Sequence, residues 1–256
     1  IASISKLYDA VAVTKLVSDG RLSLDKTIAD YLPELVGRIE NAEQITLRLM
    51  LQHRSGIPNF TDAPDFWAAP AETYEASLAL ILDQPANFEP GKKYEYCNTN
   101  YLLINKIMDD VLGYGYFQFI QEEILVPLSL NNTFSSLSDV MNIEHVMSGY
   151  HVGYSGDLKE NDYGMHATAE DVGTFVRALN DGSLFGPGEQ EIYASIYEYE
   201  HSGWVPGYQS FAKYHKDLDA VVVAFYSTTA PKLYNWNLSQ IINNRIVKIL
   251  KRQKSS

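Results

Sequence analysis

The stretch that decides how this chain is interpreted is Ile1-Ala2-Ser3-Ile4-Ser5-Lys6-Leu7-Tyr8. It combines the start of a helix with two reactive side chains, those of Ser3 and Lys6. Apolar residues follow at a helical spacing through Leu16, until Asp19-Gly20 ends the pattern. The spacing predicts a helix with Ser3 at its N-terminus. Ser3 and Lys6 then lie one turn apart, so the lysine amine can reach the serine hydroxyl. The pair is a candidate nucleophile beside a candidate base.

The Ser-x-x-Lys spacing needs support from elsewhere in the chain. Ser23-Leu24-Asp25-Lys26 and Ser210-Phe211-Ala212-Lys213 have the same spacing. A purely structural alternative is that Ser3 only caps its helix.

Tyr96-Cys97-Asn98 is a second candidate, where an extended segment meets a helix predicted from Asn98 or Thr99 to Gly113. A phenol held near cations can act as a base, and both polar tips could face one cavity. The alternative is a core tyrosine followed by an asparagine cap.

His201-Ser202-Gly203, followed by Trp204, is a third candidate, because a glycine lets a ligand approach an edge strand closely and a histidine offers a donor or a charge. His151-Val152-Gly153 has the same pattern, so His201 could equally be a satisfied surface residue.

The remaining periodicity predicts secondary structure around these motifs. Tyr208 to His215 and Ala220 to Ser227 favour an antiparallel hairpin, and Thr168 with Asp171 resembles a capping box before a helix. A long helix is predicted from Asn235, packing on the sheet through one apolar face made of Leu238, Ile241, Ile242, Ile246 and Leu250.

Taken together and in this order, the three motifs resemble those of the serine β-lactamase and D,D-peptidase superfamily. Flanking stretches agree with the resemblance, which extends from Ile1 to about Ser227. They are Leu51-Gln52-His53-Arg54-Ser55-Gly56, Pro90-Gly91, Pro127-Leu128 with Thr133, and Gly164 with Ala167-Thr168-Ala169-Glu170-Asp171.

The resemblance implies an α+β fold, with an antiparallel sheet flanked by helices. It places all of 1–256 in one domain, with a mostly helical subdomain at about 31–165 inserted between 1–30 and 166–256. Members of the superfamily usually have two strands and a helix ahead of the nucleophile, and residues 1–256 lack them. We therefore expect a bare sheet edge, and either lost residues or an impaired enzyme.

The resemblance also implies the chemistry. Ser3 would attack a carbonyl, and Lys6 with Tyr96 would take its proton and deliver it to the leaving group. Asn98, His201 and Gly203 would contact the substrate, and the backbone N–H groups of Ser3 and Trp204 would form the oxyanion hole. No metal or cofactor is expected.

Two departures from the superfamily pattern refine the expectation. His201 stands where β-lactamases usually have a lysine that binds the substrate carboxylate, which favours the peptidase and esterase branches over β-lactam turnover. Cys97 replaces a serine, and a small buried filler is favoured over a thiol nucleophile.

Composition limits the partners. A net charge of −12 opposes binding to nucleic acid, and no apolar run is long enough for stable membrane insertion. The expected partner is a small-molecule or peptide substrate, and the oligomeric state is left open. One cysteine does not determine the compartment, although the resemblance favours an exported protein.

Three functions remain in competition. The first is a serine hydrolase that forms an acyl-enzyme on an ester or amide, whether peptidase, esterase or β-lactamase. The second is a penicillin-binding sensor or scaffold with little or no turnover. A metal hydrolase is third, because the six histidines show no ligand-like spacing.

Overall fold

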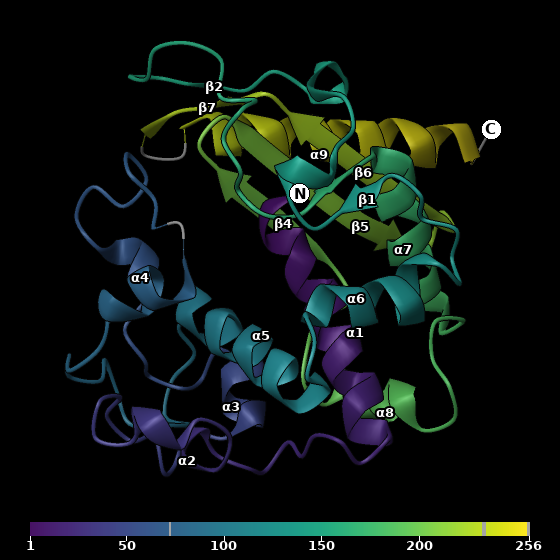
Figure 1. The fold of residues 1–256 in the computed structure, drawn as a ribbon. Coiled ribbons are helices and arrows are strands. Elements are labelled where there is room, and N and C mark those ends of the chain that lie inside the picture. Colours follow the sequence, from purple (N-terminus) through teal and green to yellow (C-terminus); the bar gives the residue numbers. More distant parts are fainter. Residues whose placement is uncertain (72, 232–233, 255–256) are drawn as a thin grey trace. The chain divides into compact units, whose positions relative to one another are not determined.

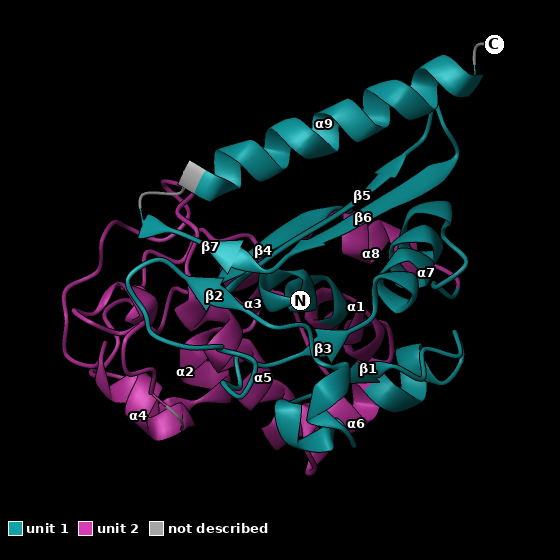
Figure 2. Ribbon diagram, turned by 90° about the horizontal axis from the view of Figure 1, so that it is seen from above, with its two compact units in different colours: residues 1–8, 121–186, 198–256 teal, residues 9–120, 187–197 magenta. Residues whose placement is uncertain are grey.

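The computed structural model describes residues 1–71, 73–231 and 234–254, and Figure 1 shows their fold. The chain forms two compact units. Unit 1 contains 1–8, 121–186 and 198–256, and unit 2 contains 9–120 and 187–197 (Figure 2). The predicted helical subdomain, 31–165, overlaps unit 2 over 31–120.

A three-stranded antiparallel sheet is the centre of unit 1. Its strands are β4 (His201–Val205), β5 (Tyr208–His215) and β6 (Ala220–Tyr226), in the order β4-β5-β6. The register pairs Gly203 with Ser210, and Ser210 with Phe225. The predicted hairpin is therefore confirmed, and β4 and β6 are the two edge strands.

Helices cover both faces of this sheet, because side chains alternate between the faces along each strand. Helix α7 (Ala169–Asp181) lies on the face that includes Val223, while α9 (Tyr234–Lys254) lies on the opposite face, where Trp236 contacts the Phe211 ring (Figure 2). The mixed α+β architecture with a helix-flanked antiparallel sheet is thus confirmed.

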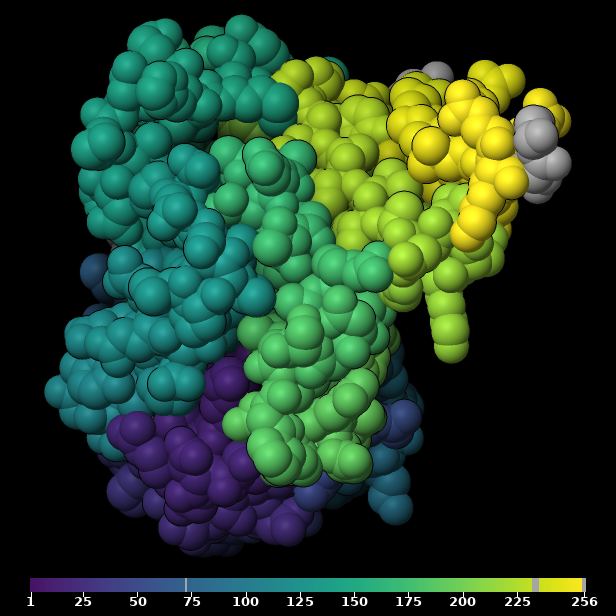
Figure 3. Space-filling model, turned by 90° about the vertical axis from the view of Figure 1, so that its right-hand side faces the viewer, coloured from purple at the N-terminus to yellow at the C-terminus, as the bar shows by residue number. Residues whose placement is uncertain are grey.

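Helix α9 has the predicted length but packs through a different face. Leu238, Ile241, Ile242 and Ile246 are 38–54% exposed, so the predicted buried row was wrong. The helix instead turns Trp236, Ser239 and Asn243 toward the sheet. The Trp236 ring contacts Phe211, and the Tyr226 hydroxyl donates to Asn243 Oδ1 and lies 3.4 Å from the Ser239 carbonyl oxygen. The basic C-terminal end of α9 lies on the surface, in yellow in Figure 3.

The start of α7 also differs from expectation in one detail. The Thr168 hydroxyl accepts from the Asp171 N–H at 3.2 Å, as an N-cap should. The buried Asp171 carboxylate does not complete a capping box. It accepts instead from the Asn132 N–H at 2.8 Å and the Thr133 hydroxyl at 2.9 Å.

Short elements complete unit 1, which also includes the first residues of helix α1 (Ser5–Ser18). The antiparallel pair is β1 (Thr133–Phe134) with β3 (His166–Ala167), and the parallel pair is β2 (Tyr150–His151) with β7 (Thr228–Thr229). The short helical turns are η1 (Ala2–Ile4), η4 (Gln121–Leu125), η5 (Leu137–Asp139) and η6 (Ile143–His145).

Unit 2 is helical in the part of the chain described. Helix α1 (Ser5–Ser18) runs into it from unit 1, and α5 (Asn98–Leu112) packs against α3 (Leu47–Leu51). Helix α5 begins where predicted and ends at Gly113, whose φ of +77° suits a glycine. The other described helices and helical turns of unit 2 are α2 (Ile28–Tyr31), η2 (Pro33–Leu35), η3 (Phe60–Asp62), α4 (Tyr74–Ala79), α6 (Tyr116–Ile120) and α8 (Glu189–Ala194).

Among the residues described, no helix combines the length and the apolar character needed to cross a membrane.

Candidate active site

Ser3 lies in the middle of η1, one turn before helix α1 is established. The Lys6 amine approaches the Ser3 hydroxyl, with Nζ 3.3 Å from Oγ, and Lys6 is only 7% exposed. Ile1, not Ser3, is the N-cap of η1, so the cap interpretation of Ser3 was wrong. A lysine at this distance can donate to the hydroxyl or, when neutral, take its proton.

The backbone just before Ser3 is unusual. Ala2 has a φ of +48°, in the left-handed region that costs a residue with a Cβ about 1 kcal/mol or more. The Ser210 hydroxyl helps to hold this conformation by donating to the Ile1 carbonyl at 2.8 Å. The serine is therefore presented from a backbone that is anchored on the sheet.

The competing Ser-x-x-Lys matches do not form such a pair. Ser210 and Lys213 lie on strand β5, where residues three apart point to opposite faces of the sheet. Ser23 and Lys26 lie outside any helix. Only the first match has helical geometry that brings the hydroxyl and the amine together.

Strand β4 brings His201, Gly203 and Trp204 to the edge of the sheet beside η1. Gly203 makes this close approach possible. A Cβ added there would lie 2.4 Å from Ser210 Oγ, 2.5 Å from the Ile1 carbonyl oxygen and 2.8 Å from Ala2 Cβ. Gly203 thus sets how closely the segment carrying Ser3 lies against β4.

His201 is a neutral imidazole at pH 7. Burial, and secondly the positive charge of Lys6, lower the pKa of His201 to about 4. Its Nδ1 lies 2.6 Å from the Ser202 carbonyl oxygen, so in the neutral ring Nδ1 holds the proton and Nε2 is an acceptor. His201 can therefore form a hydrogen bond with a substrate without contributing a positive charge.

Tyr96 and Asn98 lie in unit 2, at the start of α5. Cys97 is the N-cap position, so the prediction of Asn98 as a cap was wrong. The Asn98 N–H donates to Asn59 Oδ1 at 2.9 Å, and its amide donates to the Thr61 hydroxyl at 3.1 Å. The Asn98 side chain is therefore held in a fixed orientation.

The half-buried Tyr96 ring is packed against His53, with ring centroids 4.4 Å apart. His53 Nδ1 accepts from the Cys97 N–H at 3.1 Å, which fixes the backbone between the tyrosine and the asparagine. His53 has a φ of +55° and is 2% exposed. It is a positioning element that motif reasoning did not assign to the site.

Cys97 itself is a structural residue. Its Sγ lies 3.3 Å from the Ile57 carbonyl oxygen, and burial raises the pKa of the thiol. A thiol in this state is a poor nucleophile, which agrees with the expectation of a buried filler.

Unit 1 thus brings together Ser3, Lys6, His201, Gly203 and Trp204, and unit 2 brings together Tyr96 and Asn98. The Beta-lactamase family model matches residues 1–195. The chain belongs to the β-lactamase family. The recognition of this superfamily from the three motifs is confirmed.

Relatives of this β-lactamase family member include penicillin-binding protein 4 of Amycolatopsis lactamdurans, which is 29% identical over 199 residues, covering 70% of this chain and 50% of the relative. Protein flp of Staphylococcus aureus strain MW2 is 29% identical over 134 residues, covering 52% of this chain and 27% of the relative. The chain therefore spans about a quarter to a half of the length of these relatives.

Solved structures share the fold. D-amino acid amidase from Ochrobactrum anthropi SV3, complexed with L-phenylalanine, has a TM-score of 0.83 at 22% identity, covering 99% of this chain and 84% of that one. The penicillin-binding protein from Bacillus halodurans has a TM-score of 0.75 at 20% identity, covering 90% and 81%. The β-lactamase fold of this chain is thus one found in an amidase and a penicillin-binding protein.

Proposed function

We propose that this protein is a serine hydrolase that forms an acyl-enzyme on Ser3 with an ester or amide substrate. The observation that carries the proposal is the Ser3–Lys6 pair, 3.3 Å apart, beside the edge strand β4 in a member of the β-lactamase family. The helix that follows Ser3 adds a positive partial charge, which favours the developing alkoxide.

In the proposed mechanism Ser3 Oγ attacks the substrate carbonyl carbon, and its proton passes to Lys6 and Tyr96. The tetrahedral intermediate collapses to the acyl-enzyme while the same groups protonate the leaving oxygen or nitrogen. Water then attacks the ester, gives up one proton, and Ser3 recovers its hydrogen as the acid leaves. The N–H groups of Ser3 and Trp204 are proposed to stabilise the oxyanion, each worth about a hundredfold or more in rate.

The substrate class follows from His201. A neutral imidazole cannot supply the ion pair that a lysine would give to a substrate carboxylate. We therefore expect neutral esters and amides to react better than penicillins. The amidase among the structural neighbours supports an amide as one substrate class.

The test incubates the protein separately with a fluorescent penicillin, p-nitrophenyl acetate and D-phenylalanine amide. Intact mass reports acylation, and released product reports turnover. The Ser3→Ala variant should lose both signals, while the matched control Ser23→Ala, from the second Ser-x-x-Lys match, should keep them. A Lys6→Gln variant should acylate about 100-fold more slowly or worse.

The outcomes separate the candidate functions. An adduct on Ser3 together with product establishes the hydrolase and its preferred leaving group. A stable adduct without product would support the sensor or scaffold instead. Equal reactivity of the wild type and Ser3→Ala would refute Ser3 as the nucleophile.

A further inference from the structure

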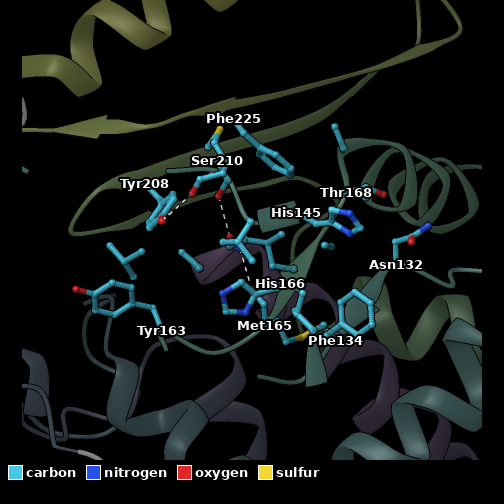
Figure 4. Close-up of a pocket in the computed structure, with 18 of the residues that line it drawn as sticks. Asn132, Phe134, His145, Tyr163, Met165, His166, Thr168, Tyr208, Ser210 and Phe225 are labelled. Atoms are coloured by element: carbon cyan, nitrogen blue, oxygen red, sulfur yellow. Dashed lines mark hydrogen bonds between the residues drawn. The ribbon is translucent and has the colours of Figure 1, made fainter. Parts of the chain in front are cut away.

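Each unit must hold its own share of the proposed catalytic groups in place. In unit 1 the Ser210 hydroxyl, labelled in Figure 4, donates to the Ile1 carbonyl at 2.8 Å and anchors the segment that carries Ser3. In unit 2 the group that needs a fixed position is the Tyr96 phenol. Tyr96 lies in an irregular segment before helix α5, so its position must come from another part of unit 2.

Residues 53–56 hold this segment through their main chain. The Arg54 carbonyl accepts from the Gly91 N–H at 2.8 Å, and the His53 carbonyl accepts from the Glu95 N–H at 2.9 Å. These residues belong to the stretch that resembles a superfamily motif in the sequence, and the proposed mechanism gives that stretch no part. The contacts show that it lies directly against the segment that carries the proposed base.

The His53 side chain adds two contacts to the same segment. Its Nδ1 accepts from the Cys97 N–H at 3.1 Å, and its ring packs on the Tyr96 ring, with centroids 4.4 Å apart and planes inclined by 30°. Together with the bond from Glu95, His53 alone therefore contacts three consecutive residues. Histidine suits this place because it is the aromatic side chain that has a hydrogen-bond acceptor next to Cγ.

The His53 side chain is itself held by its surroundings. It is 2% exposed, and its φ of +55° is a conformation that a residue with a Cβ keeps only where the surrounding structure enforces it. The Tyr101 and Tyr197 ring centroids lie 5.4 and 6.2 Å from its own. Asn100 Nδ2 lies 3.5 Å from Nδ1, and the Ser55 hydroxyl donates to Asn100 Oδ1 at 2.6 Å. The imidazole ring therefore cannot turn without displacing these neighbours.

We propose that His53 is the residue that positions the Tyr96 phenol for proton transfer. It is too deeply buried to touch a substrate, so it acts through Tyr96 and not on the reacting atoms. Proton transfer needs its groups within hydrogen-bond reach, and a misplacement of about 1 Å costs roughly a hundredfold in rate. This role rests on the proposed function, because it is defined by the reaction in which Tyr96 takes part.

Two substitutions separate the ring from the acceptor. His53→Asn keeps an acceptor next to Cγ and loses the ring, while His53→Gly loses both, and both new residues tolerate a positive φ. With p-nitrophenyl acetate, the maximal acylation rate should fall about 100-fold in His53→Gly and about tenfold in His53→Asn. The ester concentration that gives half the maximal rate should change less than about threefold, because the substitutions leave ground-state binding unchanged.

Met108→Ala is the matched control for a loss of packing in unit 2. Met108 is fully buried on α5 and lies about 15 Å along the helix axis from Asn98. This variant should lower the melting temperature, yet acylate at the wild-type rate wherever it is still folded. A positioning role thus predicts a loss of rate that does not follow from the loss of stability.

Hydrogen exchange of the Cys97 amide, measured by NMR, reports the contact without any substrate. The amide should exchange about tenfold faster in His53→Gly than in Met108→Ala, and at close to the wild-type rate in His53→Asn. A wild type that forms no adduct on Ser3 would refute the proposed hydrolase. The exchange rates would still decide whether His53 holds the segment, so the two failures are distinguishable.

Three results overturn the proposal. The first is acylation at the wild-type rate in both His53→Gly and His53→Asn. The second is a loss of rate in Met108→Ala as large as that in His53→Gly. The third is Cys97 exchange that His53→Gly leaves unchanged. If His53→Gly does not fold, His53→Asn compared with the wild type decides, and an unchanged acylation rate refutes the role of the ring.

Discussion

Replacing Gly203 by alanine should separate the position of Ser3 from its chemistry. The added Cβ would lie 2.5 Å from the Ile1 carbonyl oxygen and 2.8 Å from Ala2 Cβ, whereas ordinary contacts begin near 3.4 Å. The η1 turn must therefore retreat from β4 by about 1 Å. A displacement of this size at a reacting atom costs roughly a hundredfold in rate. Overpacking should also lower the free energy of unfolding by about 1–3 kcal/mol.

The assay measures the acylation rate by intact mass after mixing with p-nitrophenyl acetate, together with the urea-induced unfolding curve. Gly173→Ala is the matched control, because its Cβ would meet only Val223 Cγ2, at 3.7 Å. That variant should keep the acylation rate and gain about 0.5–1 kcal/mol, since alanine suits a helix interior better than glycine. If Gly203→Ala acylates at the wild-type rate and unfolds at the same urea concentration, the argument that Gly203 sets the position of Ser3 is wrong.

Four further predictions follow from single sites. Gly56→Ala should cost about 2 kcal/mol or more in urea unfolding, because φ is +80° and the Cβ would lie 2.0 Å from the Phe88 carbonyl oxygen, whereas Gly37→Ala, with φ of +77° and open space, should cost only about 1 kcal/mol. The pKa of His201 is about 4 in the folded chain, against an ordinary value of 6.5, so the unfolded chain binds more protons between these pH values. His201 should therefore contribute about 2 kcal/mol of stability, after allowing for partial exposure, that is gained as pH rises across that window. His201→Gln should make the slope in urea titrations at pH 4, 5.5 and 7 shallower by that amount, while the lowered pKa values of His151, His166 and His215 keep part of it. Asp171→Asn replaces the carboxylate that accepts from the Asn132 N–H and the Thr133 hydroxyl by an amide, and should lower the free energy of unfolding by about 2 kcal/mol in a thermal melt. An unchanged melt would argue against a stabilising role for these two hydrogen bonds. Because burial raises the pKa of the Cys97 thiol, a disulfide reagent should label it only after denaturation, and rapid labelling of the folded protein would contradict that burial.

Local sequence periodicity was enough to predict the regular elements of the sheet and several helices. The β5–β6 hairpin follows from alternating and β-branched residues, and Gly113 ends α5 as expected. Helix α9 shows the limit of the method. An apolar row usually marks the buried face, but here the side toward the sheet carries Trp236, which contacts Phe211, together with Ser239 and Asn243, which contact the Tyr226 hydroxyl. Periodicity reports where apolar residues recur on a helix, and not which side of the helix meets the sheet.

The candidate site was predictable only in part. Helical spacing alone is enough to predict that Ser3 and Lys6 lie close together. The same spacing between Ser210 and Lys213 does not bring the two side chains together, because these residues lie on a strand. The residues that hold Asn98 were missed because they lie 37–39 positions earlier in the chain, at Asn59 and Thr61. No local pattern reports a hydrogen bond between such distant residues.

The outermost strand of the sheet has a consequence for how molecules of this protein behave toward each other. Strand β6 reads Ala-Val-Val-Val-Ala-Phe-Tyr, without the lysine, proline or charge that commonly blunts an edge, and no described strand pairs with its outer side. What opposes the meeting of two such edges is long-range repulsion, since each chain has a net charge of −12. Salt screens that repulsion within about 10 Å at 0.1 M. Added salt should therefore lower the colloidal stability of concentrated solutions.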